Sequence, residues 1–342
     1  MDLAIRELNP KHEADWDAYV ESHPEATFCH QVGWKRVLEL SYGFNGRYLL
    51  AHRNGAICGV LPLVHVRRFP FPPALISTPL CVYGGVIAED DNVARELEDA
   101  AAALARSLNV SYLELRNRKR LRAGWTVSNS MATFRKRISD DCEVNLLAIP
   151  GPRRAHIRRG IKLGFTVASD SELLRFMPVY ARRVRDLGSP VYPTRFFQAL
   201  LNIFGSRCRI KTVIFDGIVQ ASAMNFYFKD EVISYYVASI PGPERSAVNA
   251  FLYWDTMREA AEEGCRVVDF SRSAVGTGTY VYKKRWGIEP ALLNYQYCLV
   301  TASMPPNITP LNPRYRLAIK TWQKLPLAVA GFLGPMVSKA VV

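Results

Sequence analysis

The sequence lacks the patterns that would mark a metalloprotein, a disulfide-stabilised protein or a secreted protein. Its seven cysteines are single and show no CxxC spacing, so we expect reduced core thiols. The six histidines show no pairing at ligand spacing, and we assign no metal. The N-terminus mixes acids with a base and has no apolar stretch behind it. This excludes a secretory signal and predicts a cytoplasmic protein.

Acidic residues are in deficit, with 31 Asp and Glu against 44 Lys and Arg and a formal net charge of +13. The excess implies an anionic partner, such as a small molecule, a glycan precursor, nucleic acid or an acidic membrane surface. A generally basic solvated surface is an equally weighted alternative. Clustering favours anion sites, at residues 116–122 (RNRKRLR), 153–162 (RRAHIRRGIK) and 283–285 (KKR). Nucleic-acid binding is supported only by the positive charge, because the sequence has no recognition-helix or RRM-like signature.

Long polar tracts are also absent, and the 342 residues are 49% hydrophobic, enough for substantial buried cores. We therefore expect two domains. The segment 149–152 (IPGP) is rich in Pro and Gly, which is typical of a loop, and it predicts a domain boundary near residues 139–152. The predicted ranges are a first domain at 1–145, a second at 146–300 and a helical tail at 301–342.

One order of elements occurs twice along the chain. Residues 48–66 form two β-rich runs around Asn54-Gly55, and residues 209–228 repeat this design around Asp216-Gly217, both typical hairpin turns. Each hairpin is followed by a helical pattern and then a strand, at 92–107 and 110–116 in the first half and at 247–262 and 265–272 in the second. The repeat predicts a tandem duplication of one mixed α/β (α+β) unit with largely antiparallel sheets.

The segment 267–290 (VVDFSRSAVGTGTYVYKKRWGIEP) holds the candidate site. A strand ends at Phe270, and the glycines that follow permit a tight turn whose N–H groups could face an anion or an oxyanion. A turn that binds nothing is the alternative. The residues predicted here are Asp269, Arg272, Gly276, Thr277, Gly278, Tyr280, Lys283, Lys284 and Trp286.

Other candidates lie outside this segment. Aromatic and amide side chains could line a cleft or simply belong to the core, namely Trp34, Tyr83, Asn249 and Tyr253. Glu114 and Asp269 could accept a proton, although pairing with Arg116 or Arg272 is the favoured role. Arg154 and Arg158 lie in a predicted basic helix that could contact an anionic part of a substrate.

The order of the motifs resembles FemAB-like proteins of the group found with exosortase and PEP-CTERM exopolysaccharide systems. The signature DFSRS, then GTGTYVYKKRWG, then a strand at 293–298 carries this resemblance. Further motifs agree in order, at 30–34 (HQVGW), 59–63 (GVLPL), 83–85 (YGG), 112–116 (YLELR), 154–158 (RAHIR) and 183–190 (RVRDLGSP). The similarity covers nearly the whole chain.

The resemblance implies two GNAT-type acyltransferase domains facing a shared cleft. It also implies acyl or aminoacyl transfer to an amine or hydroxyl of a cell-envelope, exopolysaccharide or peptidoglycan precursor. In Fem transferases a lysine that follows an aromatic residue, just beyond the glycine turn, lies close to the reacting groups. Tyr282-Lys283 matches this motif, so Lys283 is expected to stabilise the tetrahedral transition state. On a strand, Lys284 would point to the opposite face.

The sequence departs from two related patterns. Residues 239–246 (SIPGPERS) replace the Arg/Gln-x-x-Gly-x-Gly/Ala loop of coenzyme-A-using GNAT domains, which disfavours acetyl-CoA. The span 175–210 leaves no room for the long coiled-coil arm of some Fem aminoacyltransferases. We expect no tightly bound cofactor, and the donor stays open between aminoacyl-tRNA and acyl-CoA. A non-catalytic module that binds an anionic glycan or lipid-linked sugar is the alternative function.

The C-terminal tail allows two interpretations. Pro326, Pro335 and Lys339 interrupt its apolar run, so we do not expect it to span a membrane. Trp322 with the lysines on either side could form an interfacial helix at the inner membrane face. Docking of the tail on the first domain is the other interpretation.

Overall fold

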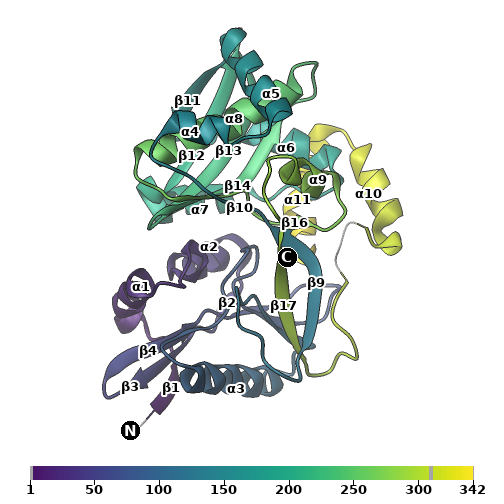
Figure 1. Ribbon diagram of the computed structural model, residues 1–342. Coiled ribbons are helices and arrows are strands. Elements are labelled where there is room, and N and C mark those ends of the chain that lie inside the picture. Colours follow the sequence, from purple (N-terminus) through teal and green to yellow (C-terminus); the bar gives the residue numbers. More distant parts are fainter. Residues whose placement is uncertain (1–2, 308–310, 342) are drawn as a thin grey trace. The chain divides into compact units, whose positions relative to one another are not determined.

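The computed structural model describes residues 3–307 and 311–341 and divides the chain into two compact units. Unit 1 comprises Met1–Met131, Leu292–Ile308 and Lys339–Val342, and unit 2 comprises Ala132–Ala291 and Thr309–Ser338. The chain leaves unit 1 within β9 (Thr126–Thr133) and returns within β17 (Ala291–Leu299) (Figure 1). The predicted ranges instead assign residues 292–300 to the second domain.

Unit 1 contains two sheets. The first has the order β1-β3-β4-β7, with β1 (Leu3–Glu7), β3 (Leu49–Arg53), β4 (Ala56–Leu61) and β7 (Ile87–Ala88). The second includes the run β9-β17-β8-β6-β5-β2, with β2 (Asn45–Gly46), β5 (Val64–Val66), β6 (Ala74–Ile76) and β8 (Tyr112–Leu115). The helices of this unit are α1 (Glu13–Ser22), α2 (Gly33–Tyr42) and α3 (Asp91–Ser107), with short 3-10 turns at Pro10–His12 and Phe28–His30.

Helix α3 shows how the core of unit 1 is built. Asp90 caps the helix by accepting a hydrogen bond from the N–H of Val93 at 2.8 Å. Val93, Leu97 and Ala101 recur at a spacing of one helical turn, so they share one face. That face is buried in a cluster with side chains of β3 and β4.

Unit 2 is built on one six-stranded sheet of order β10-β15-β14-β13-β12-β11. Its strands are β10 (Arg135–Arg137), β11 (Thr166–Asp170), β12 (Cys208–Phe215), β13 (Ile218–Phe228), β14 (Glu231–Ser239) and β15 (Val267–Asp269). All pairs are antiparallel except β14 with β15, which is parallel. The remaining elements are α4 (Cys142–Leu147), α5 (Gly151–Lys162), α6 (Phe176–Asp186), α7 (Thr194–Phe204), α8 (Arg245–Glu262), β16 (Ser273–Ala274), α9 (Gly278–Lys284), α10 (Arg316–Gln323) and α11 (Leu327–Val341), with 3-10 turns at Gly205–Arg207 and Pro313–Tyr315.

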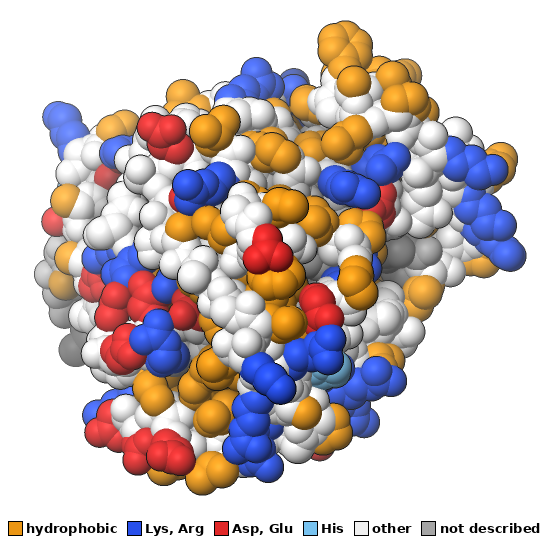
Figure 2. All heavy atoms as spheres, turned by 90° about the horizontal axis from the view of Figure 1, so that it is seen from above, with side chains coloured by type: hydrophobic (Ala, Val, Ile, Leu, Met, Phe, Trp, Pro, Cys, Tyr) orange, Lys and Arg blue, Asp and Glu red, His pale blue; other side chains and the backbone are white. Residues whose placement is uncertain are grey.

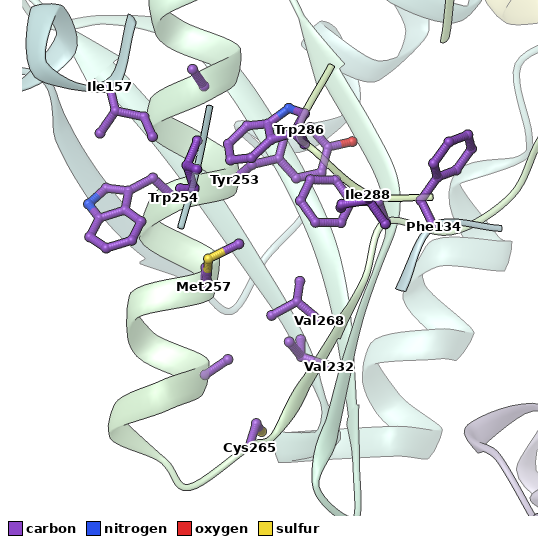
Figure 3. Packing of buried hydrophobic residues seen from close by; sticks show 14 of the residues in the cluster. Phe134, Ile157, Val232, Tyr253, Trp254, Met257, Cys265, Val268, Trp286 and Ile288 are labelled. Atoms are coloured by element: carbon purple, nitrogen blue, oxygen red, sulfur yellow. The ribbon is translucent and has the colours of Figure 1, made fainter. Parts of the chain in front are cut away.

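Helices cover both faces of this sheet. Tyr227 of β13 belongs to the apolar cluster packed under α8. Met257 and Val268 of the same cluster are labelled in Figure 3. Phe226, the neighbour of Tyr227 on β13, instead contacts Phe204 of α7, with ring centroids 6.2 Å apart. Because adjacent strand residues point to opposite faces, α8 and α7 lie on opposite sides of the sheet.

The two predicted hairpins are confirmed. Asn54 and Gly55 have φ angles of 54° and 83°, and Asp216 and Gly217 have 49° and 74°. Positive φ at both central positions is what a two-residue type I′ turn requires. The predicted α/β class with largely antiparallel sheets is likewise confirmed.

The segment after β15 differs from the predicted strand. Residues 278–284 form the short helix α9, so the expectation that Lys283 and Lys284 lie on a strand was wrong. Thr277 caps this helix, its hydroxyl accepting a hydrogen bond from the Tyr280 N–H at 3.4 Å. Its own N–H donates to the Ala274 carbonyl at 3.2 Å. These two bonds stabilise a helical turn where β-branched and aromatic residues favoured a strand.

The tail contains helices α10 and α11, and its residues Thr309–Ser338 belong to unit 2. The Arg185 guanidinium donates to the Leu325 carbonyl at 2.9 Å, and the Gln323 amide donates to the Asp186 carbonyl at 3.1 Å. Within the described ranges, no helix has both the length and the apolar character needed to cross a bilayer.

Candidate functional site

The site of unit 2 begins where two parallel strands stop pairing. Strands β14 and β15 pair through Glu231 with Val267, Val232 with Val268 and Ile233 with Asp269. Beyond Asp269 strand β15 ends, while β14 continues to Ser239 and, among the described residues, pairs only with β13. This half of β14 therefore has no described strand beside it on the β15 edge.

A pocket of about 560 Å³ occupies this region. Its walls come from the end of β14, the end of α6, the first turns of α8 and helix α9. The lining residues are Arg183, Leu187, Ser189, Val237, Ser239, Arg245, Ser246, Asn249, Tyr253, Thr277, Gly278, Thr279, Tyr282 and Lys283. Among the residues described, no group of three or more His, Cys, Asp or Glu side chains could hold a metal ion.

Lys283 is the buried cation of this pocket, with a side chain only 7% exposed. Its ammonium group donates to the carbonyls of Ser271 at 3.1 Å and Arg272 at 3.0 Å. An ammonium has three N–H donors, so these two acceptors leave one donor for the pocket that Lys283 lines.

A sharp turn after β15 directs these two carbonyls towards Lys283. Ser271 has a φ of 61°, in the left-handed region that residues other than glycine adopt infrequently. The fully buried Asp269 carboxylate stabilises this turn by accepting hydrogen bonds from the Ser271 N–H at 2.7 Å and the Thr133 hydroxyl at 2.9 Å. Asp269 thus supports the backbone beneath Lys283 instead of lining the pocket.

The environment of Lys283 holds its proton weakly. The pKa of Lys283 is lowered to about 7: burial lowers it most, the negative charge of Asp269 opposes this, and the positive charge of Arg272 adds a smaller lowering. A negative charge arriving in the pocket would favour the protonated form, because opposite charges interact strongly where water is excluded.

Aromatic packing fixes the position of α9. The Trp286 ring packs against Phe270 with centroids 5.2 Å apart, and Phe270 stacks on Tyr253 at 4.6 Å. Figure 3 shows Trp286 and Tyr253 side by side in the buried cluster. The guanidinium of Arg153, on α5, lies 4.5 Å from the ring centre of Tyr282. Burial raises the pKa of Tyr282 to about 12, which keeps its hydroxyl protonated at neutral pH.

Two arginines give the pocket a second region of positive charge. Arg183 and Arg245 both line it, and the Arg245 guanidinium donates to the Ser239 hydroxyl at 3.2 Å. Burial and then the charge of Arg245 lower the pKa of Arg183 to about 10. Mutual repulsion of this kind is relieved when an anion binds between the two groups.

The structure gathers some of the predicted site residues in this pocket and places others elsewhere. Asn249, Tyr253, Thr277, Gly278 and Lys283 line it. Gly276, Tyr280, Lys284 and Trp286 belong to the same segment but do not: Lys284 is exposed, Tyr280 packs on Phe134, and Trp286 is fully buried.

The basic helix α5 has mixed contacts. Arg154 donates to the Leu147 carbonyl at 2.8 Å, and Arg158 is exposed. Arg159 forms an ion pair with Glu244. A substrate contact by Arg154 or Arg158 stays a prediction.

The candidates in the first half are buried in unit 1. Arg116 pairs with Glu114 at 2.7 Å, the role favoured from the sequence. Trp34 is fully buried and contacts Phe28, with ring centroids 5.5 Å apart. Tyr83 is also buried, with the Arg118 guanidinium 5.4 Å from its ring centre.

Sequence reasoning missed much of the pocket wall. Arg183 falls in the RVRDLGSP motif and Arg245 in the SIPGPERS segment, yet neither was assigned to the site. The position of SIPGPERS between a predicted strand and a predicted helix was the available signal, because ligands often bind where a strand leads into a helix N-terminus.

Comparisons with known proteins concern the fold that contains this pocket. Residues 152–284 match the family model described as an acetyltransferase (GNAT) domain. A search of curated proteins gives no match. Among solved structures, FemX is similar with a TM-score of 0.68 and 14% identity, covering 92% of this chain and all of that chain.

Two further structures share the fold. The tandem GNAT protein from the clavulanic acid biosynthesis pathway has a TM-score of 0.57 and 12% identity, covering 90% of this chain and 100% of that one. L-PGS from Bacillus licheniformis has a TM-score of 0.55 and 11% identity, covering 94% and 99%. The predicted tandem of GNAT-like units is therefore confirmed as the fold. Residues 152–284 thus match a GNAT acetyltransferase domain, within a chain whose fold is similar to those of FemX and the tandem GNAT protein.

Proposed function

We propose that this protein is an acyltransferase in which the pocket of unit 2 binds an activated acyl donor. An amine or hydroxyl of the acceptor attacks the donor carbonyl, and a tetrahedral oxyanion forms. The Lys283 ammonium group stabilises that oxyanion with the one N–H donor that is not bonded to the carbonyls of Ser271 and Arg272. The tetrahedral species then expels the alkoxide or thiolate of the donor, which takes up the proton lost by the nucleophile. No covalent enzyme intermediate is needed.

The position of Lys283 is the observation that carries the proposal. Its charge is buried and its pKa is lowered to about 7, so the ammonium is poorly stabilised before reaction. An oxyanion beside it would restore the lost stabilisation. This interaction is stronger in the transition state than with bound substrate, which is the condition for accelerating a reaction.

The arginines support a donor that carries phosphate. Arg183, Arg245 and the first turn of α8 surround one side of the pocket, and a helix N-terminus favours negative charge. Aminoacyl-tRNA and acyl-CoA both provide phosphate groups, so this feature suits either donor. We propose a cell-envelope or exopolysaccharide precursor as acceptor, on the basis of the motifs shared with FemAB-like proteins of exosortase and PEP-CTERM systems.

The test is acyl transfer by the full chain with acyl-CoA thioesters and aminoacyl-tRNAs in parallel. Peptidoglycan and lipid-linked sugar precursors serve as acceptors, and mass spectrometry detects acylated product. We expect product from one donor class in the wild-type protein and strong loss in Lys283→Ala. Saturable binding of precursors without product from either donor would instead identify a non-catalytic binding module.

A further inference from the structure

Helix α11 has its small residues inward and its large apolar residues outward. Ala330, Gly334 and Ser338 recur every four residues and are buried. Gly334 lies so close to the backbone of Val191 that an added Cβ would be 2.8 Å from its nitrogen and oxygen. On the other side Phe332 is 75% exposed and Met336 is 59% exposed.

This arrangement reverses the usual pattern of a helix that only docks on its own protein. Such a helix buries its larger apolar side chains against the core and exposes polar ones. Here the exposed apolar side chains are Leu327, Val329, Phe332, Met336 and Val337. Val329, Phe332 and Met336 lie on the side of the helix opposite the buried small residues, and we call these three the α11 apolar face. Small inward residues hold the helix close to unit 2, and the apolar face stays available for another partner.

The preceding helix adds positive charge. Arg316, Lys320 and Lys324 of the α10 segment are exposed, as is the apolar Leu317. Residues 301–342 contain no Asp or Glu. Figure 2 shows blue and orange side chains together at its right-hand edge, the edge at which α10 lies in Figure 1. The tail thus combines exposed apolar area with positive charge only.

We propose that α10 and α11 form a membrane-binding surface for a bilayer rich in anionic lipid. The α11 apolar face would enter the boundary between headgroups and acyl chains, and the basic residues of α10 would contact lipid phosphates. With 15 residues, α11 is too short to span a bilayer and would lie in the interface. A second copy of the chain fits less well, because a symmetric contact would bring like charges together.

The experiment measures co-sedimentation of the full chain with phosphatidylcholine vesicles, with and without phosphatidylglycerol. Wild-type protein should sediment with the anionic vesicles, and added salt should weaken binding by screening. Lys320→Glu with Lys324→Glu should reduce the partition coefficient about 30-fold or more, since each basic residue contributes roughly fivefold. Phe332→Ser with Met336→Ser should reduce it by about tenfold or more for each side chain.

Matched variants elsewhere in unit 2 serve as controls. Leu174 is 80% exposed, so Leu174→Ser removes a comparable apolar side chain away from the tail. Arg195→Glu with Arg266→Glu makes the same change in charge at two exposed arginines. Both controls should bind vesicles as the wild type does.

Equal losses in controls and tail variants would overturn the proposal, since binding would then follow overall charge or hydrophobicity. Self-association in light scattering without vesicle binding would also overturn it and assign the α11 apolar face to a second copy. If Phe332→Ser with Met336→Ser lowers the melting temperature, the charge variants and the salt dependence of the wild type still decide the question.

Discussion

Each unit has a buried cation after the strand that follows its main helix: Arg116 directly follows β8, and Lys283 lies on α9, beyond β15. The two cations differ in what surrounds them. In unit 1, Arg116 donates to the Glu114 carboxylate at 2.7 Å and to the carbonyls of Thr78 at 3.2 Å and Cys81 at 2.6 Å. In unit 2, Lys283 donates to two carbonyls and lines a pocket. Arg116 is paired with a carboxylate and ties segments of the fold together, whereas Lys283 lines a pocket where it can act on a ligand.

The carboxylate near each cation also differs between the two units. Beside Arg116, the carboxylate of Glu114 pairs with the cation directly. Beside Lys283, Asp269 bonds to Ser271 and Thr133 and influences the lysine through space. Duplication of one unit therefore does not duplicate the chemistry, because the orientation of a single carboxylate decides whether the cation is neutralised.

The comparison predicts that Arg116→Ala causes the largest loss, and that the loss is in stability. Removing the cation leaves the Glu114 carboxylate buried without its partner, which should lower the free energy of unfolding by about 3–5 kcal/mol. Denaturant unfolding measures this loss. Lys119→Ala, which breaks an exposed ion pair with Glu25, should cost about 1 kcal/mol or less. If Arg116→Ala kept its stability but lost activity, Arg116 would have a functional role like that of Lys283, and the comparison would be wrong.

Lys283→Ala should affect turnover rather than folding. Loss of one oxyanion donor typically lowers turnover by about 100- to 1,000-fold, and we expect a value in that range. Lys284→Ala is the matched control, because successive helix positions point in different directions and Lys284 is exposed. Single-turnover rates of folded variants provide the measurement. A larger loss in Lys284→Ala would show that the wrong lysine was assigned.

The arginines of the pocket should affect donor affinity. Arg183→Gln and Arg245→Gln should each raise the donor Kd by about tenfold or more, because hydrogen bonds to charged groups contribute about 1.5–3 kcal/mol. Titration of the active donor at several salt concentrations measures this effect. Arg195→Gln, at an exposed position of α7, is the control. If the Kd values stayed unchanged while turnover fell, the two arginines would act in catalysis and not in donor binding.

The smallest expected effect is on the pH dependence of the rate. The pKa of Lys283 is lowered to about 7, so the catalytic ammonium is present below this pH and is lost above it. With an acceptor that does not titrate in this range, kcat/KM for the donor, which reports the free enzyme, should fall about tenfold per pH unit above 7.

Lys283→Arg provides the control for this profile. Arginine keeps its charge throughout the range, so the variant should have a lower rate that does not change near pH 7. A wild-type rate that rises through pH 7 would contradict the ammonium role and assign Lys283 as a proton acceptor.

Local chemistry explains which elements could be predicted from the sequence. The hairpins at Asn54-Gly55 and Asp216-Gly217 were predictable because the turn residues themselves set the backbone. Helix α9 was missed because its Tyr and Val residues favour strands, while its stability depends on the Thr277 cap and on the packing of Trp286. The β-propensity of a short segment is easily overridden by such contacts.

The site was predictable only in part. Lys283 was found through a motif, since its place after Tyr282 and the glycine turn is local. The pocket wall could not be predicted in this way. Arg183 and Arg245 come from different helices, and they line one pocket at the place where β15 ends and the longer β14 continues. The length of one strand relative to its neighbour is a property of the folded sheet, and no pattern within either strand encodes it.

The return of the chain to unit 1 through β17 has a consequence for synthesis on the ribosome. Strand β17 lies between β8 and β9 in its sheet, although nearly 160 residues of unit 2 are made before it. When residue 131 has emerged, unit 1 still lacks a central strand and must wait for its completion. All six strands of the unit 2 sheet are made once β15 is complete, so this sheet can form before the second sheet of unit 1 receives β17.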